Sequence, residues 1–325
     1  MRPVRSALAA PAALAGALLA ALTLAGCGQS TSASPPATSA SSATAVATPS
    51  AAGFPVTVEA GNGPVAVAKR PERIVSLSPS ATESLFAIGA GPQVVAVDDQ
   101  SNHPADAPKS DLSGFKPNVE AIIARKPDLV VVANDADSVV AALGKVGVPV
   151  LLEPAATKLD EAYDQITDLG AATGNGDRAA ELVAGMRKQL DEITAAAPKD
   201  AKLTYYHELD TTPYSATSTT FIGQIYGLFG MSNIADEAPD AAGGYPKLSA
   251  EFVAKADPDL VFLADTKCCG QSRDTLAKRP GWSKLSAVKN DQVVLLDDDV
   301  ASRWGPRVVD LARQIGDAVQ KVAAG

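Results

Sequence analysis

The sequence predicts an α/β protein with two lobes, each built on a parallel β-sheet. The prediction rests on a motif that occurs twice: a glutamate, a short amphipathic segment, a proline seven residues later, and then Asp-Leu-Val with an apolar run. The copies start at Glu120 and Glu251 and contain Pro127 and Pro258. In each copy the proline ends a helix, and the apolar run is typical of a strand buried on both faces. Because such a strand needs helices above and below it, two similar α/β lobes are expected.

The first 26 residues predict an export signal rather than folded structure. Arg2 and Arg5 precede an apolar run from Ala7 to Leu24, and Ala25-Gly26-Cys27 follows. Small residues directly before a cysteine resemble the lipobox of bacterial lipoproteins, in which Cys27 becomes the acylated first residue. A transmembrane anchor is the alternative, since the run is long enough to span a bilayer. Residues 27–53, rich in Ser, Thr, Ala and Pro, are expected to be a tether without a core of their own.

Composition narrows the classes of partner. Without residues 1–26 the chain has 26 basic and 37 acidic residues, a net charge of about −11. This acidic balance argues against nucleic acid, because phosphate contacts need clustered Lys and Arg. About 300 residues remain, enough for two domains with cores of their own. Beside Cys27 the only cysteines are Cys268 and Cys269, which cannot form a disulfide framework.

The N-terminal lobe is expected to span residues 54–157. It should begin with a hairpin around Gly61-Asn62-Gly63, and Ser78 to Glu83 should open the first helix, because Ser and Thr before a glutamate favour a helix start. Further along, continuous apolar runs predict buried strands. The expected elements are strands at 56–58, 65–67, 73–77, 94–97, 129–132 and 149–152, and helices at 78–89, 120–126 and 134–144.

Residues 158–197 are expected to be helical except at Gly174-Asn175-Gly176. The segment after this break has an apolar face and lies between the two motif copies, so it is predicted to bridge the lobes. The C-terminal lobe, residues 198–325, should repeat the order of the first. Its expected elements are strands at 202–209, 259–263 and 292–296, and helices opened near 217–223, at 251–256 and at 306–323.

Four stretches carry a resemblance to a known family: RPERIVSLSPSATESLFAIGA, FKPNVEAIIARKPDLVVV, YPKLSAEFVAKADPDLVFL and WGPRVVDLARQI. With the chain around them, residues 70–325 resemble the substrate-binding lipoproteins of ABC importers for vitamin B12, haem and ferric siderophores. The resemblance implies two lobes joined by one long helix, with the ligand in the cleft between them. It also implies a monomer, lipid-anchored to the outer face of the cytoplasmic membrane, that delivers its ligand to a permease and its ATPase.

The resemblance further implies that one glutamate per lobe docks onto arginines of the permease, and Glu120 and Glu251 stand at the matching positions. Carboxylate–guanidinium pairs are bidentate and orienting, which suits this role. The alternative is that both glutamates only favour the positive end of a helix dipole.

The resemblance places the ligand site on loops at the strand ends. An aromatic wall with a few polar groups suits a large ligand, although individual members of the set could instead be core or loop residues. The predicted ligand-binding residues are His103, Phe115, Tyr214, Tyr245, Arg303, Trp304 and Arg307.

Two ligand classes remain open at this point. The motif stretches and the turn at Trp304 resemble the cobalamin branch best, which favours a corrinoid. Against this, Phe115, Asn134 and Tyr245 stand where cobalamin-binding relatives have tryptophan. A ferric siderophore or haem is the alternative, since Arg303 or Arg307 could hold an anionic iron chelate.

Two further groups suggest chemistry. His207-Glu208-x-Asp210 could bind a metal, but with two histidines in the chain a dedicated site is not predicted, and His207 is expected to be a partly buried residue that its neighbours satisfy or one that faces the ligand. Cys268 and Cys269 could form a vicinal disulfide, since export favours oxidation, or stay as surface thiols.

Neither a phosphate-binding loop nor a nucleophile elbow occurs, so we predict a binder without a resident cofactor. The alternatives are a hydrolase or redox enzyme using His207 and the thiols, and a lipoprotein that only contacts other envelope proteins.

Overall fold

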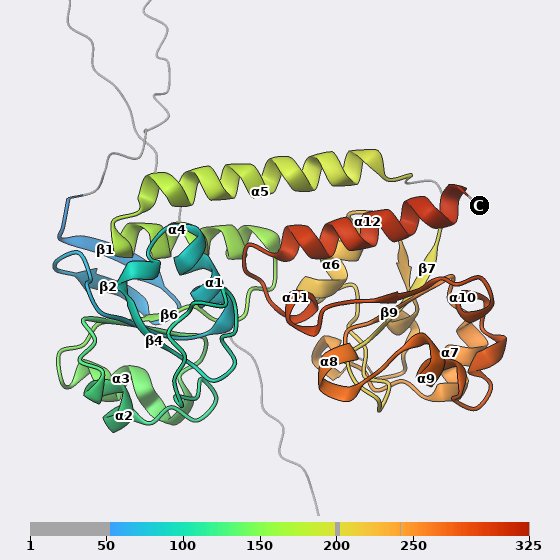
Figure 1. Cartoon of the computed structure of the whole chain (residues 1–325), viewed down its shortest axis with the longest axis horizontal. Coiled ribbons are helices and arrows are strands. Elements are labelled where there is room, and N and C mark those ends of the chain that lie inside the picture. Colours follow the sequence, from blue (N-terminus) through green and yellow to red (C-terminus); the bar gives the residue numbers. More distant parts are fainter. Residues whose placement is uncertain (1–52, 199–201, 241, 325) are drawn as a thin grey trace, which may run out of the picture. The chain divides into compact units, whose positions relative to one another are not determined.

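The computed structural model describes residues 53–198, 202–240 and 242–324. The predicted signal segment, the tether up to residue 52 and Cys27 lie outside these residues. The described chain contains two four-stranded parallel sheets and one antiparallel hairpin (Figure 1), which confirms the α/β prediction with two parallel sheets. In this part of the chain no helix is both long and apolar enough to cross a membrane.

The first sheet has the strand order β4-β3-β5-β6, and all its neighbours are parallel. Its strands are short and apolar, and β3 and β5 are buried throughout, as expected for central strands of a sheet covered on both faces. The elements are β3 (Ile74–Leu77), α1 (Pro79–Ala87), β4 (Val94–Val97), α2 (Val119–Ala124), β5 (Leu129–Val132), α3 (Val139–Gly144) and β6 (Val150–Leu152).

A hairpin covers the free edge of this sheet. Its strands, β1 (Val56–Ala60) and β2 (Gly63–Val67), pair antiparallel as predicted. Asn62 in the turn donates from its side chain to the Val150 carbonyl at 3.0 Å and accepts the Leu152 amide at 3.1 Å. The side chain thus takes the place of a further strand beside β6, which removes an edge that could pair with another chain.

The second sheet repeats the topology of the first. Its order is β8-β7-β9-β10, again parallel throughout, so each strand occupies the place of its counterpart in the first sheet. Its strands and longer helices are β7 (Thr204–Glu208), α6 (Phe221–Gly227), β8 (Ser232–Asn233), α7 (Ala250–Ala256), β9 (Leu260–Leu263) and β10 (Val293–Leu295). The short helices of this half are α8 (Thr266–Cys269), α9 (Arg273–Ala277), α10 (Ser286–Lys289) and α11 (Asp298–Ser302). Among the described residues there are also short 3-10 helices, η1 (Gly91–Gln93) and η2 (Ala136–Ser138) in the first half, and η3 (Ile234–Glu237), η4 (Ala242–Gly244) and η5 (Trp282–Lys284) in the second.

Side chains of the two motif strands alternate between cores in the same way. Leu129 and Val131 of β5, like Leu260 and Phe262 of β9, belong to one large apolar cluster that also takes in the helices. The residues between them face separate clusters on the other side of each sheet. Each sheet is therefore covered on both faces, as the continuous apolar runs predicted.

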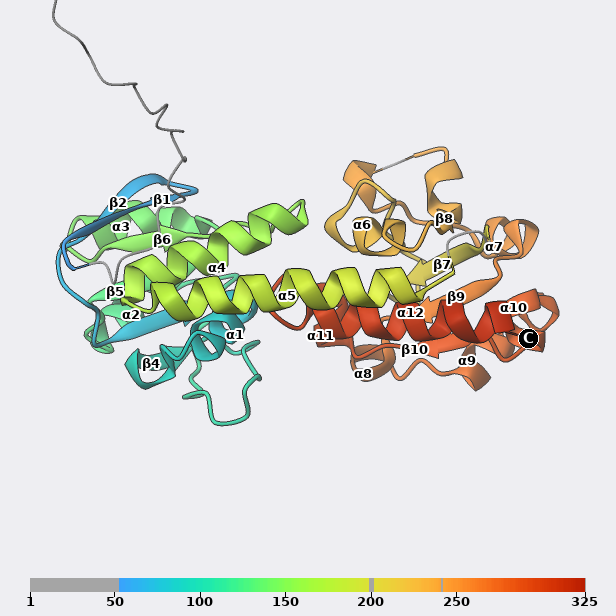
Figure 2. The same cartoon turned by 90° about the horizontal axis from the view of Figure 1, so that it is seen from above.

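Three long helices accompany the sheets. They are α4 (Leu159–Thr173), α5 (Gly176–Ala196) and α12 (Val308–Ala324). The break between α4 and α5 falls at Gly174, whose φ of 71° is left-handed and suits glycine. α5 contacts both α4 and α12 and runs alongside α12 (Figure 2), so it touches helices from both halves of the sequence.

Both motif glutamates occupy the second position of a short helix. Glu120 follows the N-cap Asn118 in α2, and Glu251 follows the N-cap Ser249 in α7. Each N-cap side chain accepts the amide of the third helical residue, which satisfies a donor that the helix start leaves free. Both glutamates are exposed. The two copies of the motif therefore have the same local structure.

An aspartate after each motif proline ties the motif to the neighbouring strand. Asp128 accepts the backbone amides of Glu72 and Arg73 at 3.0 and 2.8 Å. Asp259 accepts the amide and the hydroxyl of Thr204, both at 2.8 Å. The aspartate after the motif proline thus fixes the start of the neighbouring strand in each sheet: Asp128 fixes the start of β3, and Asp259 fixes the start of β7.

The helix expected at 134–144 is shorter than predicted. Its α-helical part starts at Val139, after the turn η2 in which Asp137 and Ser138 have left-handed φ angles of 54° and 57°. The Asn134 side chain accepts the Ala136 amide, so the segment forms an Asx turn instead of a helical turn.

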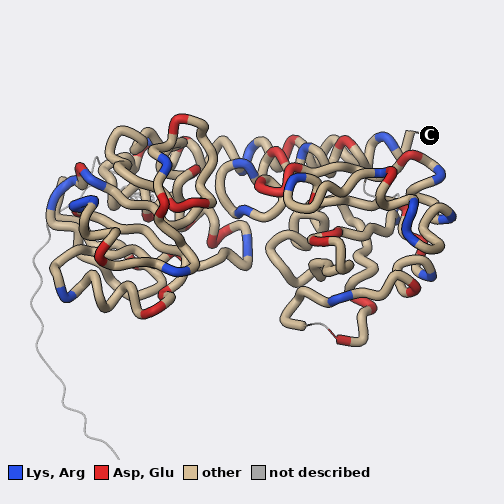
Figure 3. Tube along the Cα trace, turned by 60° about the horizontal axis from the view of Figure 1, so that its bottom comes forward, with Lys and Arg blue, Asp and Glu red and all other residues tan. Residues whose placement is uncertain are grey.

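Charged residues of both signs are scattered along the trace in Figure 3. The acidic excess of the sequence is therefore distributed over the described chain rather than gathered on one element.

We expect Asp128→Ala and Asp259→Ala each to lower the free energy of unfolding by about 1.5–3 kcal/mol, because each removes a carboxylate that accepts two hydrogen bonds. Asp317→Ala, at an exposed site on α12, is the matched control and should change stability by less than about 0.5 kcal/mol. Urea unfolding of the three variants measures this. Losses as small as the control's would show that these carboxylates do not hold the strands.

Candidate functional site

A cavity of about 500 Å³ opens at the carboxyl ends of the first sheet and against the segment that precedes α12. Its apolar wall includes Leu77, Pro79, Phe115 and Trp304. Its polar lining includes Asp98, Gln100, Asn134, Asp299, Ser302 and Arg303. Ligands of open parallel sheets bind outside the carboxyl ends of the strands, so the position is that of a binding site.

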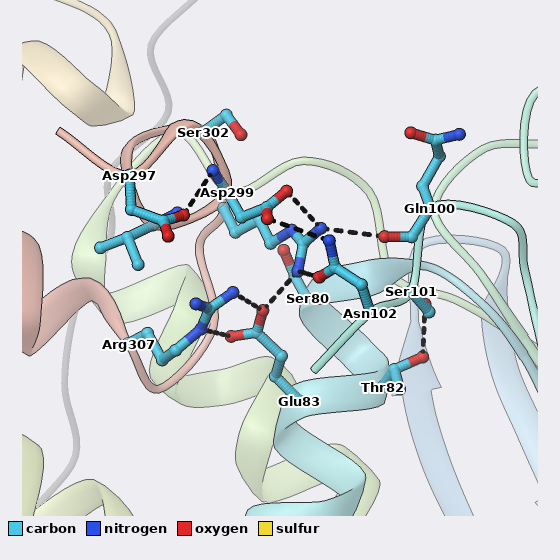
Figure 4. A network of polar contacts seen from close by, with 12 residues as sticks. Ser80, Thr82, Glu83, Gln100, Ser101, Asn102, Asp297, Asp299, Ser302 and Arg307 are labelled. Carbon is cyan, nitrogen blue, oxygen red and sulfur yellow. Dashed lines mark hydrogen bonds and ion pairs between the residues drawn. The ribbon is translucent and has the colours of Figure 1, made fainter. Parts of the chain in front are cut away.

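One buried carboxylate links the two parts of the cavity wall. Glu83 in α1, 3% exposed, accepts from Arg303 Nη1 at 2.8 Å (Figure 4). Arg307 donates to the same carboxylate from Nε at 2.9 Å and from Nη2 at 2.5 Å. Because a buried charge is costly unless it is paired and hydrogen-bonded, this group stabilises the fold only as a unit.

The second guanidinium nitrogen of Arg303 is also occupied. Arg303 Nη2 donates to Asp299 at 2.8 Å and to the Gln100 carbonyl at 2.9 Å. Asp299 in turn accepts from Asn102 at 3.0 Å and from Lys267 at 3.1 Å. Desolvation alone would raise the pKa of Asp299, but these hydrogen bonds and cations lower it below its usual value. The arginine in the wall is thus neutralised by carboxylates of the protein.

Trp304 is held by hydrogen bonds at both ends. Its amide donates to the Ser80 hydroxyl at 3.2 Å, and its indole Nε1 donates to Gln165 in α4 at 2.9 Å. The next residue is Gly305, where an added Cβ would lie 3.1 Å from the Ser80 carbonyl oxygen. The ring is therefore fixed in the wall by a close approach between this turn and α1.

Among the predicted ligand-binding residues, the cavity brings together Phe115, Arg303 and Trp304. Phe115 is 74% exposed, so its ring is free to cover a ligand. Arg307 lies behind the wall on Glu83. The other three residues are exposed and outside the cavity lining: His103, Tyr214 and Tyr245.

The His207-Glu208-x-Asp210 group does not converge on one point. His207 is fully buried, shares a hydrogen bond of 2.8 Å with the Tyr226 hydroxyl, and has its pKa lowered to about 4 by burial. Glu208 accepts two hydrogen bonds from Arg279, both at 2.5 Å. Asp210 accepts from Thr212 at the surface. Within the described residues no set of three His, Cys, Asp or Glu side chains is placed to hold a metal ion.

A second buried carboxyl group lies beside the Glu208 ion pair. Burial and the neighbouring charge of Glu208 raise the pKa of Asp265 to about 7, and neither of its oxygens has a hydrogen-bond partner among the described residues. Cys268 and Cys269, which follow in α8, are joined by a disulfide with their Cα atoms 3.8 Å apart.

A family model described as periplasmic binding protein matches residues 74–300. The chain belongs to this family. It is 32% identical over 277 residues to the ABC transporter substrate-binding lipoprotein YvrC of Bacillus subtilis, with 82% of this chain and 86% of that protein covered. It is 30% identical over 279 residues to a protein of Halobacterium salinarum named cobalamin-binding protein, with 82% and 75% covered. A crystal structure from Staphylococcus epidermidis, described as that of a possible iron-binding (periplasmic solute-binding) protein, is 30% identical with a TM-score of 0.67 and covers 77% of this chain and 99% of that one.

This periplasmic binding protein is therefore the substrate-binding protein of an ABC importer, as the resemblance of its motifs implied. Its family consists of binding proteins, so the prediction of a binder and not an enzyme is confirmed.

Several residues in the cavity of this periplasmic binding protein were missed in the sequence analysis. Asp98 follows β4 and Ser78 follows β3, whereas Asn134, which follows β5, had been noted only as standing where cobalamin-binding relatives have tryptophan. The sequence could have indicated these residues, because polar residues directly after parallel strands gather at the carboxyl edge of the sheet, where ligands bind. Asp299 could not be found in this way, since it depends on a contact between distant segments.

We expect Glu83→Ala to lower the free energy of unfolding by about 3–5 kcal/mol, because it leaves two largely buried guanidinium groups without their partner. Asp310→Ala is the control, since it removes the exposed partner of Arg313 and should cost at most about 1 kcal/mol. Chemical denaturation followed by circular dichroism compares the two. Equal, small losses would contradict the structural role given to Glu83.

Proposed function

We propose that this protein captures a corrinoid of the cobalamin type and delivers it to the permease of its importer. In this proposal the acylated Cys27 anchors the exported protein to the membrane through the tether of residues 27–53. Residues 54–157 and 198–325 form the two lobes, residues 158–197 with α5 join them, and the cavity belongs to the ligand cleft.

The observation that carries the choice of ligand is the charge balance of the cavity. Its arginine, Arg303, is already paired with Glu83 and Asp299, and the lining adds the carboxylate of Asp98. An anionic iron chelate needs cations that are free to pair with it, whereas a corrinoid presents apolar faces and a rim of neutral carboxamides. The apolar wall with Phe115 and Trp304 fits the second ligand better.

The relatives support the same choice without deciding it. The protein from Halobacterium salinarum is named a cobalamin-binding protein. The structure from Staphylococcus epidermidis is described as that of a possible iron-binding protein. The second candidate is therefore an iron chelate without net negative charge, which the charge balance of the cavity would accept. In both cases the exposed rings of Tyr214 and Tyr245, together with His103, remain proposed contacts for the parts of a large ligand outside the cavity.

Phe115→Ala should weaken cyanocobalamin binding about tenfold or more, because the exposed ring would be buried by the ligand and a tenfold change needs only ~1.4 kcal/mol. Raised ionic strength should change the affinity little, since the interaction does not rest on ion pairs. Val146→Ala, which truncates an exposed side chain outside the cavity lining, is the matched control. Isothermal titration of the purified protein measures all three.

Absence of cyanocobalamin binding up to ~100 μM, where even a weak specific site would fill, would overturn the corrinoid proposal and leave the iron chelates. If an anionic ferric siderophore bound instead, with an affinity that falls steeply with added salt, the ligand would be an anionic chelate.

For docking, we propose that Glu120 and Glu251 contact arginines of the permease. Their equivalent helix positions and their exposure support this, because each carboxylate is free to form a bidentate pair.

Glu120→Ala combined with Glu251→Ala should abolish transport and complex formation with the permease while ligand affinity stays unchanged, because rim charges act on association and orientation. Glu181→Ala combined with Glu192→Ala on α5 removes the same charge from exposed sites and serves as control. Transport assays and pull-down with the permease distinguish the two double variants. If the docking variant no longer bound ligand, the assignment would be wrong.

A further inference from the structure

Asp98 is a buried acid in the cavity wall, and one of its two carboxyl oxygens accepts no hydrogen bond from the described residues. It directly follows β4, and the residue is 3% exposed. Ser101 donates its hydroxyl to Oδ1, whereas Oδ2 receives no hydrogen bond from any residue that the structure describes. Gly114 packs against the group so closely that a Cβ there would lie 3.1 Å from Oδ2 and 2.6 Å from the Leu77 carbonyl oxygen. The carboxyl group is thus held in place at the cavity with an acceptor unused.

Three hydroxyl groups extend from Asp98 into the protein. Ser101 Oγ lies 2.9 Å from Thr82 Oγ1 (Figure 4), and Thr82 Oγ1 lies 2.8 Å from Ser76 Oγ. Ser76 Oγ in turn lies 3.4 Å from the Ser78 carbonyl oxygen. All of these residues are buried, so the chain is closed off from bulk water at its inner end.

This row of hydroxyl groups can form hydrogen bonds with Asp98 in either protonation state, because hydroxyl hydrogens rotate toward their partners. With an ionised Asp98, Ser101 donates to the carboxylate, and Thr82 donates to Ser76. With a protonated Asp98, the acid proton points to Ser101, Ser101 donates to Thr82, and the bonds from Thr82 to Ser76 and from Ser76 to the Ser78 carbonyl stay as they are. Only the hydroxyl hydrogen of Ser101 changes its partner, so taking up a proton needs no movement of heavy atoms.

Burial and the charged groups around Asp98 shift its pKa in opposite directions, with a net rise. Burial raises the pKa of its carboxyl group, and the Ser101 hydrogen bond opposes this. The charge of Asp99 raises the pKa further, and Arg303 lowers it. Asp299 lines the same cavity but is paired with Arg303.

Two further charged groups on neighbouring elements are engaged elsewhere. On α1, Glu83 is held by Arg303 and Arg307. In the segment before Gly114, Asp111 is exposed and pairs with Arg125.

We propose that Asp98 is the residue that recognises a hydrogen-bond donor of the ligand, and that ligand binding is coupled to its deprotonation. The donor is an N–H group, either a carboxamide at the rim of a corrinoid or an ammonium group of a cationic iron chelate. The inference rests on the proposed function, because it assigns a role within the same cavity. It also names the group that disfavours an anionic ligand there.

The sign of the pH effect follows from the raised pKa. The ionised carboxylate is the stronger acceptor, and it predominates above the pKa of the free protein. As the pH falls through that pKa, the carboxylate is replaced by the neutral acid, which is the weaker acceptor, so affinity falls. The ligand then lowers the pKa of Asp98 in the complex, and each ligand bound in mild acid releases up to one proton.

The test is titration of the full mature protein with cyanocobalamin at a series of pH values from about pH 8 down to about pH 4, the ordinary range of a carboxyl group, because a raised pKa makes Asp98 take up its proton at a higher pH than an ordinary aspartate. Wild-type affinity should be highest at the upper end and fall with pH. Asp98→Asn, of the same shape but without charge, should bind about tenfold or more weakly at pH 8 and show a flat profile. Asp99→Asn removes the neighbouring exposed charge and is the matched control, with affinity close to wild type at pH 8.

Calorimetry in buffers of different ionisation enthalpy supplies a readout that a merely structural role would not move. Wild type should release protons on binding in mild acid, and Asp98→Asn should release none. Ser101→Ala should shift the midpoint of the pH profile upward, because it removes the hydrogen bond that lowers the pKa of Asp98. Since the wild-type profile and proton release need no variant, the proposal stays testable even if Asp98→Asn fails to fold.

Wild-type affinity that is independent of pH, or Asp98→Asn binding as tightly as wild type, would overturn the role of Asp98 while leaving the corrinoid proposal intact. If cyanocobalamin does not bind but ferrioxamine B, a cationic ferric chelate, does so in an Asp98-dependent way, the corrinoid proposal fails and Asp98 keeps its role. Binding of neither probe, or tighter binding of anionic haemin, would overturn both.

Discussion

The ion group of Glu83 with Arg303 and Arg307 is the interaction on which the candidate site depends. Glu83 and Arg303 are 220 positions apart in the sequence, and the side chain of Glu83 is 2% exposed, so water hardly reaches the carboxylate at the centre of the group. Removing any partner would leave an uncompensated buried charge, so the three side chains keep one arrangement. That arrangement places Trp304 and Asp299 opposite α1 and thereby completes the cavity wall.

The same ion group sets the electrostatics of the cavity. Pairing Arg303 with two carboxylates leaves the polar lining without an uncommitted guanidinium group among the described residues, while Asp98 adds an acceptor. This structural interaction narrows the range of ligands, because the positive charge of Arg303, which could hold an anionic chelate, is already paired with Glu83 and Asp299. Aromatic area and neutral hydrogen bonding are what remain to bind a solute.

The internal repeat has a physical meaning at three levels. At the local level, Asn118 and Ser249 cap equivalent helices that present Glu120 and Glu251. In the sheets, Asp128 fixes the start of β3 as Asp259 fixes that of β7. At the level of topology the strand orders are the same. Two halves built alike can offer a partner two similar charged positions, which is the basis of the docking proposal.

The sequence by itself determined the α/β class, the hairpin and the two motif strands, because these follow from local patterns: apolar runs, proline stops and capping residues. It also indicated Phe115, Arg303 and Trp304, through motif resemblance. It did not place the helix at Val139, where Asn134 forms a turn instead. Only the tertiary structure decided that Arg303 and Arg307 share Glu83, and that Asp98 faces a cavity. Those facts depend on contacts between distant segments, and no local pattern records which buried charge a given arginine will pair with.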